Sequence, residues 1–212
     1  MSVFLPRRLQ YTVNSDLRDV AHEELLDLTG NIVLLGEAGG GKTELTKWLG
    51  GADHGDHVRC TARQLINGDG RQLLGNHRFL VIDALDEVTA KADGDAVDLV
   101  LRALRAAGYP RFILSCRLSE WRAATMVEAI REQYRDVPLQ VELRPLDAEQ
   151  ATEFLADRLG DAARADDVVH QFLERNLGEW LGNPQTLLML GDVAKQGPPP
   201  NTTKALFDTY VC

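Results

Sequence analysis

The residues best suited to chemistry lie at positions 36–43, which read Gly-Glu-Ala-Gly-Gly-Gly-Lys-Thr. This is the complete pattern of a phosphate-binding loop, G-x-x-x-x-G-K-[ST]. In such a loop the backbone N–H groups face phosphate oxygens, the lysine pairs with the β- and γ-phosphates, and the threonine hydroxyl ligates Mg²⁺. The sequence therefore predicts a nucleotide site made by Gly36, Glu37, Ala38, Gly39, Gly40, Gly41, Lys42 and Thr43.

The segments on either side of this loop suit its function. Residues 31–35 form a short apolar run that predicts a buried strand, and residues 43–49 have the pattern of a helix. The dipole of that helix adds about half a positive charge at its first turn. The three glycines at 39–41 let the backbone approach phosphates closely and adopt positive φ. Strand, loop and helix together predict an anion-binding site.

A second candidate group follows about forty residues later. Residues 79–83 are an apolar strand that ends in an acid, Asp83. An acid in this position of a phosphate-loop protein holds Mg²⁺, here predicted to act through a water molecule. Asp86 and Glu87 follow closely, and either carboxylate can polarise an attacking water as a general base. The sequence does not separate these two candidates, although we favour Glu87.

Two further polar residues follow the strand predicted at 111–115. Because ligands bind at the carboxyl ends of parallel strands, Ser115 and Arg117 are expected to face the γ-phosphate. A cation there would stabilise the charge that develops during phosphoryl transfer. For Arg117, the alternative of an ordinary loop arginine stays open.

The alternation of strands and helices predicts an α/β fold with a mainly parallel, five-stranded sheet. The five strands are expected at 32–35, 57–60, 78–83, 111–115 and 139–143, and the main helices at 95–106 and 119–134. Residues 9–28 are expected to precede the sheet, with Tyr11 or Val13 near the adenine. After Pro145 only helical patterns occur, including 164–181, 184–195 and 202–211. We therefore expect a nucleotide-binding domain at 1–145 and a small helical subdomain at 146–212.

Composition limits the remaining possibilities. The net charge of −9 and pI near 5.0 argue against a general nucleic-acid or anionic-membrane surface. Three widely spaced cysteines, Cys60, Cys116 and Cys212, predict reduced thiols and a cytoplasmic location. No apolar stretch reaches the roughly 18 residues that cross a membrane. The last helical pattern has no cap before Cys212, so we expect a piece of a longer protein.

In order and spacing, four blocks of this sequence resemble the NACHT-type NTPase module of the STAND class of signal-transduction ATPases. They are residues 36–43, residues 79–87 (FLVIDALDE), residues 113–117 (ILSCR) and residues 181–184 (LGNP). The family pattern after the acidic strand is Asp-Gly-apolar-Asp-Glu, and here Ala84 stands in place of the glycine. The phosphate loop alone is not specific to the family. The Asp-x-x-Asp-Glu and Asn-Pro blocks together are more specific to it.

The resemblance implies a switch that binds ATP or ADP with Mg²⁺ and hydrolyses ATP slowly. It implies that Arg117 is a sensor arginine, that Pro184 packs on the adenine, and that the full-length protein self-oligomerises in signalling or defence against phage. No membrane or direct nucleic-acid partner is expected. Two alternatives remain: a nucleotide-bound scaffold without turnover, and another phosphate-loop ATPase or kinase.

Overall fold

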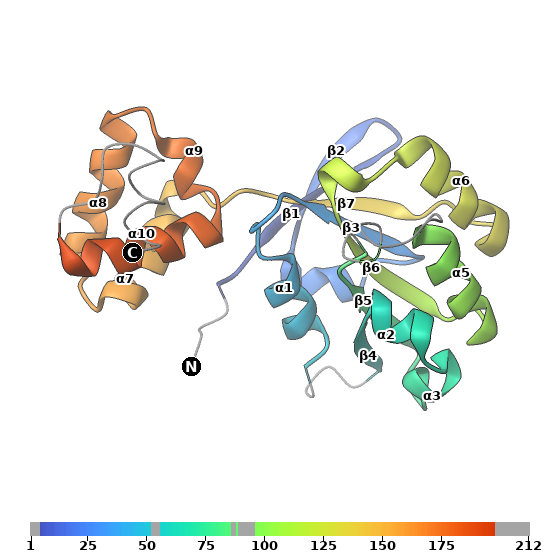
Figure 1. The fold of residues 1–212 in the computed structure, drawn as a ribbon. Coiled ribbons are helices and arrows are strands. Elements are labelled where there is room, and N and C mark those ends of the chain that lie inside the picture. Colours follow the sequence, from blue (N-terminus) through green and yellow to red (C-terminus); the bar gives the residue numbers. More distant parts are fainter. Residues whose placement is uncertain (1–4, 52–55, 86–87, 89–95, 198–212) are drawn as a thin grey trace. The chain divides into compact units, whose positions relative to one another are not determined.

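The computed structural model describes residues 5–51, 56–85, 88 and 96–197, and it divides into two compact units. The first contains residues up to 38 together with 42–144. The second begins at Pro145, and Gly39–Gly41 are grouped with it. Figure 1 draws the first unit as a sheet with helices and the second as helices alone. No helix within the described ranges is long and apolar enough to cross a membrane.

A seven-stranded sheet forms the centre of the first unit, in the order β2-β1-β7-β3-β6-β5-β4. Its strands are β1 (Arg8–Val13), β2 (Asp16–Ala21), β3 (Ile32–Gly36), β4 (His57–Thr61), β5 (Phe79–Asp83), β6 (Arg111–Arg117) and β7 (Leu139–Leu143). The strands from β3 to β7 are parallel to one another, whereas β1 is antiparallel to both β2 and β7. Within the parallel part, β6 lies between β3 and β5, so the strand of the phosphate loop and the acidic strand are not neighbours.

The prediction of five strands was therefore wrong in number, because β1 and β2 add a hairpin to the sheet. The hairpin turns at Asn14 and Ser15, whose φ angles are 51° and 70°, and both residues lie between the paired Val13 and Asp16. Consecutive left-handed residues match the strand twist in two-residue hairpins. In β2 only Val20 is buried, so this strand lacks the apolar run that predicted β3 and β5. Most of the segment 9–28 is thus part of the sheet, and apart from the turn only its last residues, from His22 onward, lie outside the strands.

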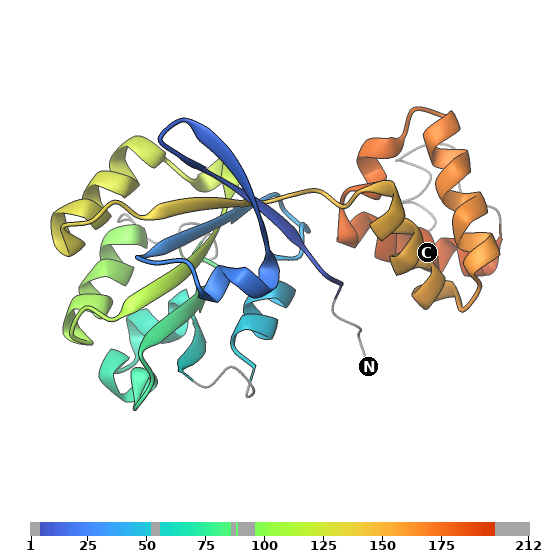
Figure 2. The same cartoon turned by 180° about the vertical axis from the view of Figure 1, so that it is seen from behind.

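Helices cover both faces of the sheet, as the two opposite views in Figures 1 and 2 show. On one face lie α2 (Ala62–Asn67), α3 (Gly70–Leu74), α5 (Ala96–Ala106) and α6 (Ala123–Tyr134), which pack on β4, β5 and β6. On the other lie the 3₁₀ helix η1 (His22–Leu26) and α1 (Lys42–Leu49). A short 3₁₀ turn, η3 (Leu118–Glu120), joins β6 to α6. Strands buried on both faces need apolar residues throughout, which accounts for the continuous runs in β3 and β5.

The second unit is helical across the residues described. It consists of α7 (Ala148–Leu159), α8 (Ala162–Glu174), α9 (Gly178–Leu181) and α10 (Pro184–Gln196). A capping box opens α7: the Asp147 side chain accepts from the Gln150 backbone N–H at 2.9 Å, and Gln150 Oε1 accepts from the Asp147 N–H at 3.2 Å. The helix predicted at 202–211 lies outside the described residues.

Candidate functional site

The phosphate loop occupies the turn between β3 and α1, as the sequence predicts. Gly36 is the last residue of β3, and Lys42 and the exposed Thr43 open α1. Within the loop, Gly39 and Gly41 have φ angles of 71° and 94°, which only glycine adopts readily. A Cβ atom at Gly36 would lie 3.3 Å from the Cβ of Leu143, so glycine also permits close packing where the loop begins.

The side chain of Lys42 folds back over the start of this loop. Its Nζ donates hydrogen bonds to the carbonyl oxygens of Gly36 and Glu37, both at 2.9 Å. The ammonium group is therefore held beside the loop backbone by two neutral acceptors. A phosphate oxygen is a stronger acceptor than either carbonyl, because hydrogen bonds between two charged groups are shorter and stronger. The lysine and the glycine-rich backbone thus fit a phosphate group.

The acidic strand β5 ends at Asp83, whose side chain is buried and hydrogen-bonded to β6. Ser115 Oγ donates to Asp83 Oδ1 at 2.8 Å, and Ser115 is fully buried. The same hydroxyl accepts from the backbone N–H of Ala84 at 2.9 Å, and the Ser115 carbonyl accepts from the N–H of Leu85 at 3.1 Å. Ser115 therefore fixes both the carboxylate and the turn that follows it.

Ala84 has a left-handed backbone, with a φ of 61°. A left-handed residue with a Cβ atom costs about 1 kcal/mol or more, so the glycine of the pattern that this sequence resembles would adopt this backbone more readily than alanine does. The exchange of glycine for alanine is small in volume, but it is not neutral for the backbone. The turn nevertheless forms, held by the two hydrogen bonds to Ser115.

Arg59 is the functional candidate that the sequence analysis missed. It lies in β4, and its Nη2 atom is 2.5 Å from Asp83 Oδ2. Its Nε donates to Thr46 Oγ1 on α1 at 3.2 Å. One sequence signal was available: an arginine between Val58 and Cys60, inside a short and partly buried strand, favours an acidic partner nearby. Burial raises the pKa of the neighbouring Cys60 thiol to about 11, and the charge of Arg59 lowers it by a smaller amount.

Both predicted residues of the fourth parallel strand lie on β6 itself, which is longer than expected. Ser115 pairs with Leu34 in register, and Arg117 pairs with Gly36, the first residue of the loop. Arg117 is exposed, whereas the hydroxyl of Ser115 is directed at Asp83. The structure thus brings Arg117 to the strand end where the loop begins, and its contact with a γ-phosphate stays a prediction.

The two candidate bases, Asp86 and Glu87, lie outside the described residues. Pro184 is described, as the first residue of α10 in the second unit. Asn183 caps this helix, since its Oδ1 accepts from the backbone N–H groups of Gln185 at 2.9 Å and Thr186 at 3.4 Å. Proline suits the first position of a helix, so capping explains the Asn-Pro pair locally. The role of Pro184 toward adenine stays a prediction.

The predicted residues also suit a magnesium ion. The described residues contain no group of three or more His, Cys, Asp or Glu side chains that could hold a metal by themselves. Mg²⁺ at nucleotide sites is held instead by one or two protein oxygens, water and substrate phosphates. The Thr43 hydroxyl and the Asp83 carboxylate, from α1 and β5, are oxygen donors of that kind.

Comparisons with solved structures identify the fold. Replication initiator DnaA bound to AMPPCP and single-stranded DNA superposes with a TM-score of 0.58 at 14% identity, over 89% of this chain and 60% of that one. AMPPCP-bound DnaA from Aquifex aeolicus gives 0.54 at 15% identity, over 82% and 58%. A Walker-type ATPase of Pyrococcus abyssi gives 0.50 at 13% identity, over 89% and 68%. This chain thus has the α/β fold of the P-loop ATPases.

The similarity is one of fold and not of close sequence. No protein-family model matches the chain, and no curated protein sequence matches it. The chain spans about three fifths of the length of the two DnaA structures. The residues at the ends of β3, β5 and β6 therefore carry the functional argument.

Proposed function

We propose that this chain is a nucleotide-binding module that binds ATP with Mg²⁺ and hydrolyses it slowly, as a conformational switch. The loop backbone and Lys42 would hold the phosphates, and Thr43 and Asp83 would hold the metal. When bound, the magnesium ion would neutralise phosphate charge during transfer. Ser115 keeps Asp83 in place, and Arg117 would face the γ-phosphate from the neighbouring strand.

One observation carries this proposal. The glycine-rich loop follows β3, and the buried Asp83 ends β5, with Ser115 of the intervening β6 bonded to Asp83. Ligands of open α/β sheets bind at the carboxyl ends of strands. A lysine, a hydroxyl group and a carboxylate at these positions are the groups that phosphoryl transfer from ATP requires.

Calorimetric titration with ATP, ADP and a non-hydrolysable ATP analogue, with and without Mg²⁺, tests the proposal directly. We expect saturable binding to a single site. Mass spectrometry of the denatured protein would detect any nucleotide that copurifies. Absence of binding to all three nucleotides would refute the proposal. Tight ADP binding without turnover would instead support the scaffold alternative.

For hydrolysis we propose Glu87 as the general base, with Asp86 as the alternative. The variants Glu87→Gln and Asp86→Asn separate them, because each keeps the size of the side chain and removes its basicity. We expect Glu87→Gln to bind ATP normally and to lower the rate of phosphate release. A rate that falls only in Asp86→Asn would reassign the base.

At a finer level we propose a NACHT-type module of the STAND class, acting in a signalling or anti-phage defence protein. The support is the order of the four sequence blocks, including the Asn183–Pro184 pair. We propose that Pro184 contacts the adenine and that the longer protein self-associates with ATP. Light scattering with ATP and with ADP tests the assembly. A Pro184→Ala variant, compared for ADP affinity, tests the contact.

We propose no direct partner among nucleic acids, and we place the protein in the cytoplasm. One of the structural neighbours is bound to single-stranded DNA. A net charge of −9, however, disfavours binding to the phosphate backbone, which depends on Lys and Arg contacts. The free thiols of the buried Cys60 and Cys116 fit a reducing compartment. Fluorescence anisotropy with labelled single-stranded DNA should therefore show no saturable binding at physiological salt.

A further inference from the structure

The carboxylate of Asp83 is already neutralised by a cation from the protein. Asp83 is 2% exposed, and the side chain of Arg59 is 25% exposed. The Arg59 guanidinium donates to Asp83 Oδ2 at 2.5 Å, while Ser115 occupies Oδ1. A buried carboxylate without a partner is costly, and a bonded cation removes much of that cost. Both oxygens of the predicted metal ligand are therefore engaged within the protein.

Arg59 also connects Asp83 to the helix that carries Lys42 and Thr43. Its Nε donates to Thr46 Oγ1, and this hydroxyl donates to the carbonyl oxygen of Thr43 at 3.0 Å. These hydrogen bonds form an unbroken chain from β5 through β4 to the first turn of α1. The guanidinium thus links Asp83 to the backbone of Thr43, and these are the two residues predicted to hold a magnesium ion.

The backbone is built to admit this arginine. A Cβ atom at Gly50, directly after α1, would lie 2.4 Å from the Cβ of Arg59. No Cβ atom tolerates that distance, so any larger residue at position 50 would push β4 away from the end of α1. The glycine therefore allows the stem of Arg59 to pass close to the helix and reach Asp83.

We propose that Arg59 is a positioning residue that serves as the resident counter-cation of Asp83 and gives up Oδ2 when Mg²⁺ arrives with the nucleotide. This rests on the proposed function and adds a form of regulation to it. Because the ion must compete with a bonded guanidinium, Mg²⁺ improves nucleotide affinity less than it would beside an unpaired acid. Without Mg²⁺, the arginine maintains the geometry of Asp83 and α1.

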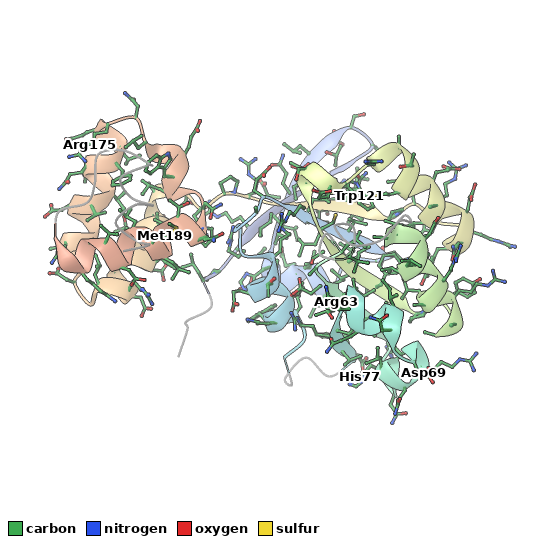
Figure 3. All side chains as sticks on the ribbon, viewed as in Figure 1. Arg63, Asp69, His77, Trp121, Arg175 and Met189 are labelled. Carbon is green, nitrogen blue, oxygen red and sulfur yellow. The ribbon has the colours of Figure 1, made fainter. Side chains whose placement is uncertain are left out.

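The test measures the dissociation constant of AMPPCP in EDTA and in Mg²⁺, for Arg59→Gln and for wild type. The quantity compared is the value in EDTA divided by the value in Mg²⁺. Removal of the competing guanidinium should raise this ratio about tenfold, the size of one charge-assisted hydrogen bond. A purely structural role would change affinity by the same factor in both buffers and leave the ratio unchanged. The matched control is Arg63→Gln, an exposed arginine on α2 (Figure 3), for which we expect the wild-type ratio.

Thermal unfolding in EDTA without nucleotide provides a second measurement. Arg59→Gln leaves a buried carboxylate without its cation, so its Tm should fall by about 5 °C or more. The Tm of Arg63→Gln should stay within about 1 °C of wild type. Equal Tm values for the two variants would overturn the inference.

Arg59→Lys keeps the test decisive if Arg59→Gln does not fold. A lysine preserves the charge but cannot donate to Thr46 and Asp83 together through a planar group, so the ratio should rise by about threefold. A ratio at or below the wild-type value would contradict the inference while leaving nucleotide binding intact. If the wild-type protein binds nucleotide in neither buffer, the proposed function itself fails.

Discussion

The central strands β3, β5 and β6 and the outer hairpin β1–β2 belong to one sheet but differ in almost every other respect. Every residue of β3 and β5 is buried, whereas five of the six residues of β2 are exposed. The phosphate loop follows β3, Asp83 ends β5, and Ser115 and Arg117 lie in the last three residues of β6. The hairpin runs antiparallel, so Val13 lies beside the start of β7, at the opposite end of the sheet from the loop. This argues against contact between Val13 and a nucleotide.

The polar groups of the candidate site and the packing contacts of the hairpin are thus divided between the two regions. To the core the hairpin contributes apolar side chains, with Leu9 and Val20 buried in the same cluster as Leu45 and Leu49 of α1. The central strands provide the polar groups of the site, and two of these, Asp83 and Ser115, are buried. Substitutions in the two regions should therefore have separable effects on binding and on stability.

The largest effect is expected at Lys42, where binding should fail without loss of folding. Lys42→Ala removes at least two charge-assisted contacts to phosphate, each contributing about 1.5–3 kcal/mol, so ATP affinity should fall about a thousandfold. Calorimetry measures the affinity, and thermal unfolding checks that Tm is retained. Lys47→Ala is the control, since Lys47 is exposed on the same helix and pairs only with Glu44 among the described salt bridges. Unchanged ATP affinity in Lys42→Ala would remove the phosphate-loop assignment.

The hairpin should respond in the opposite way, losing stability but not affinity. Leu9 is fully buried in β1, so Leu9→Ala should lower the free energy of unfolding by about 3 kcal/mol. Leu17 of β2 is 65% exposed, and Leu17→Ala should change the free energy of unfolding by less than about 0.5 kcal/mol. Urea denaturation measures both variants. Similar values for the two would show that the hairpin is not packed as described.

A substitution at Ser115 should affect both stability and nucleotide binding. Ser115→Ala removes the donor to Asp83 and the acceptor for Ala84, and it should cost about 1–2 kcal/mol of stability. It should also weaken Mg²⁺-dependent nucleotide binding, because Asp83 loses one of its two fixed contacts. Ser119→Ala, at an exposed position of η3, is the control for both measurements. If Ser115→Ala changed neither stability nor nucleotide binding, the hydrogen bond from Ser115 to Asp83 would not be needed to position Asp83.

The smallest predicted change is a gain in stability at the turn of the hairpin. Ser15 has a φ of 70°, so Ser15→Gly should relieve left-handed strain and stabilise the protein by about 0.5–1 kcal/mol. Ser15→Ala keeps the strain and should bring no gain. Urea denaturation again gives the values, and ATP affinity should not change in either variant. Destabilisation by Ser15→Gly would contradict the described turn.

The sequence predicted the central strands well because burial on both faces demands an unbroken apolar run, and 78–83 and 111–115 have one. It missed β1 and β2, whose residues are mixed in polarity and whose turn, Asn14–Ser15, lacks the glycine that usually marks a two-residue hairpin. It placed the phosphate loop and Asp83 from local spacing alone. Arg59 escaped notice because its partner is 24 residues away, and only the register of β4 with β5 brings them together.

The exposed strand β2 has one further consequence, which concerns self-association. If the hairpin were absent, β7 would end the sheet and present unpaired backbone groups beside the apolar Val141 and Leu143. Such a border is a template for aggregation. The hairpin moves the border to a strand bearing Asp16, Arg18 and Asp19, whose charges discourage pairing with another chain. We therefore expect the same short segment that escaped prediction to protect this α/β fold against aggregation.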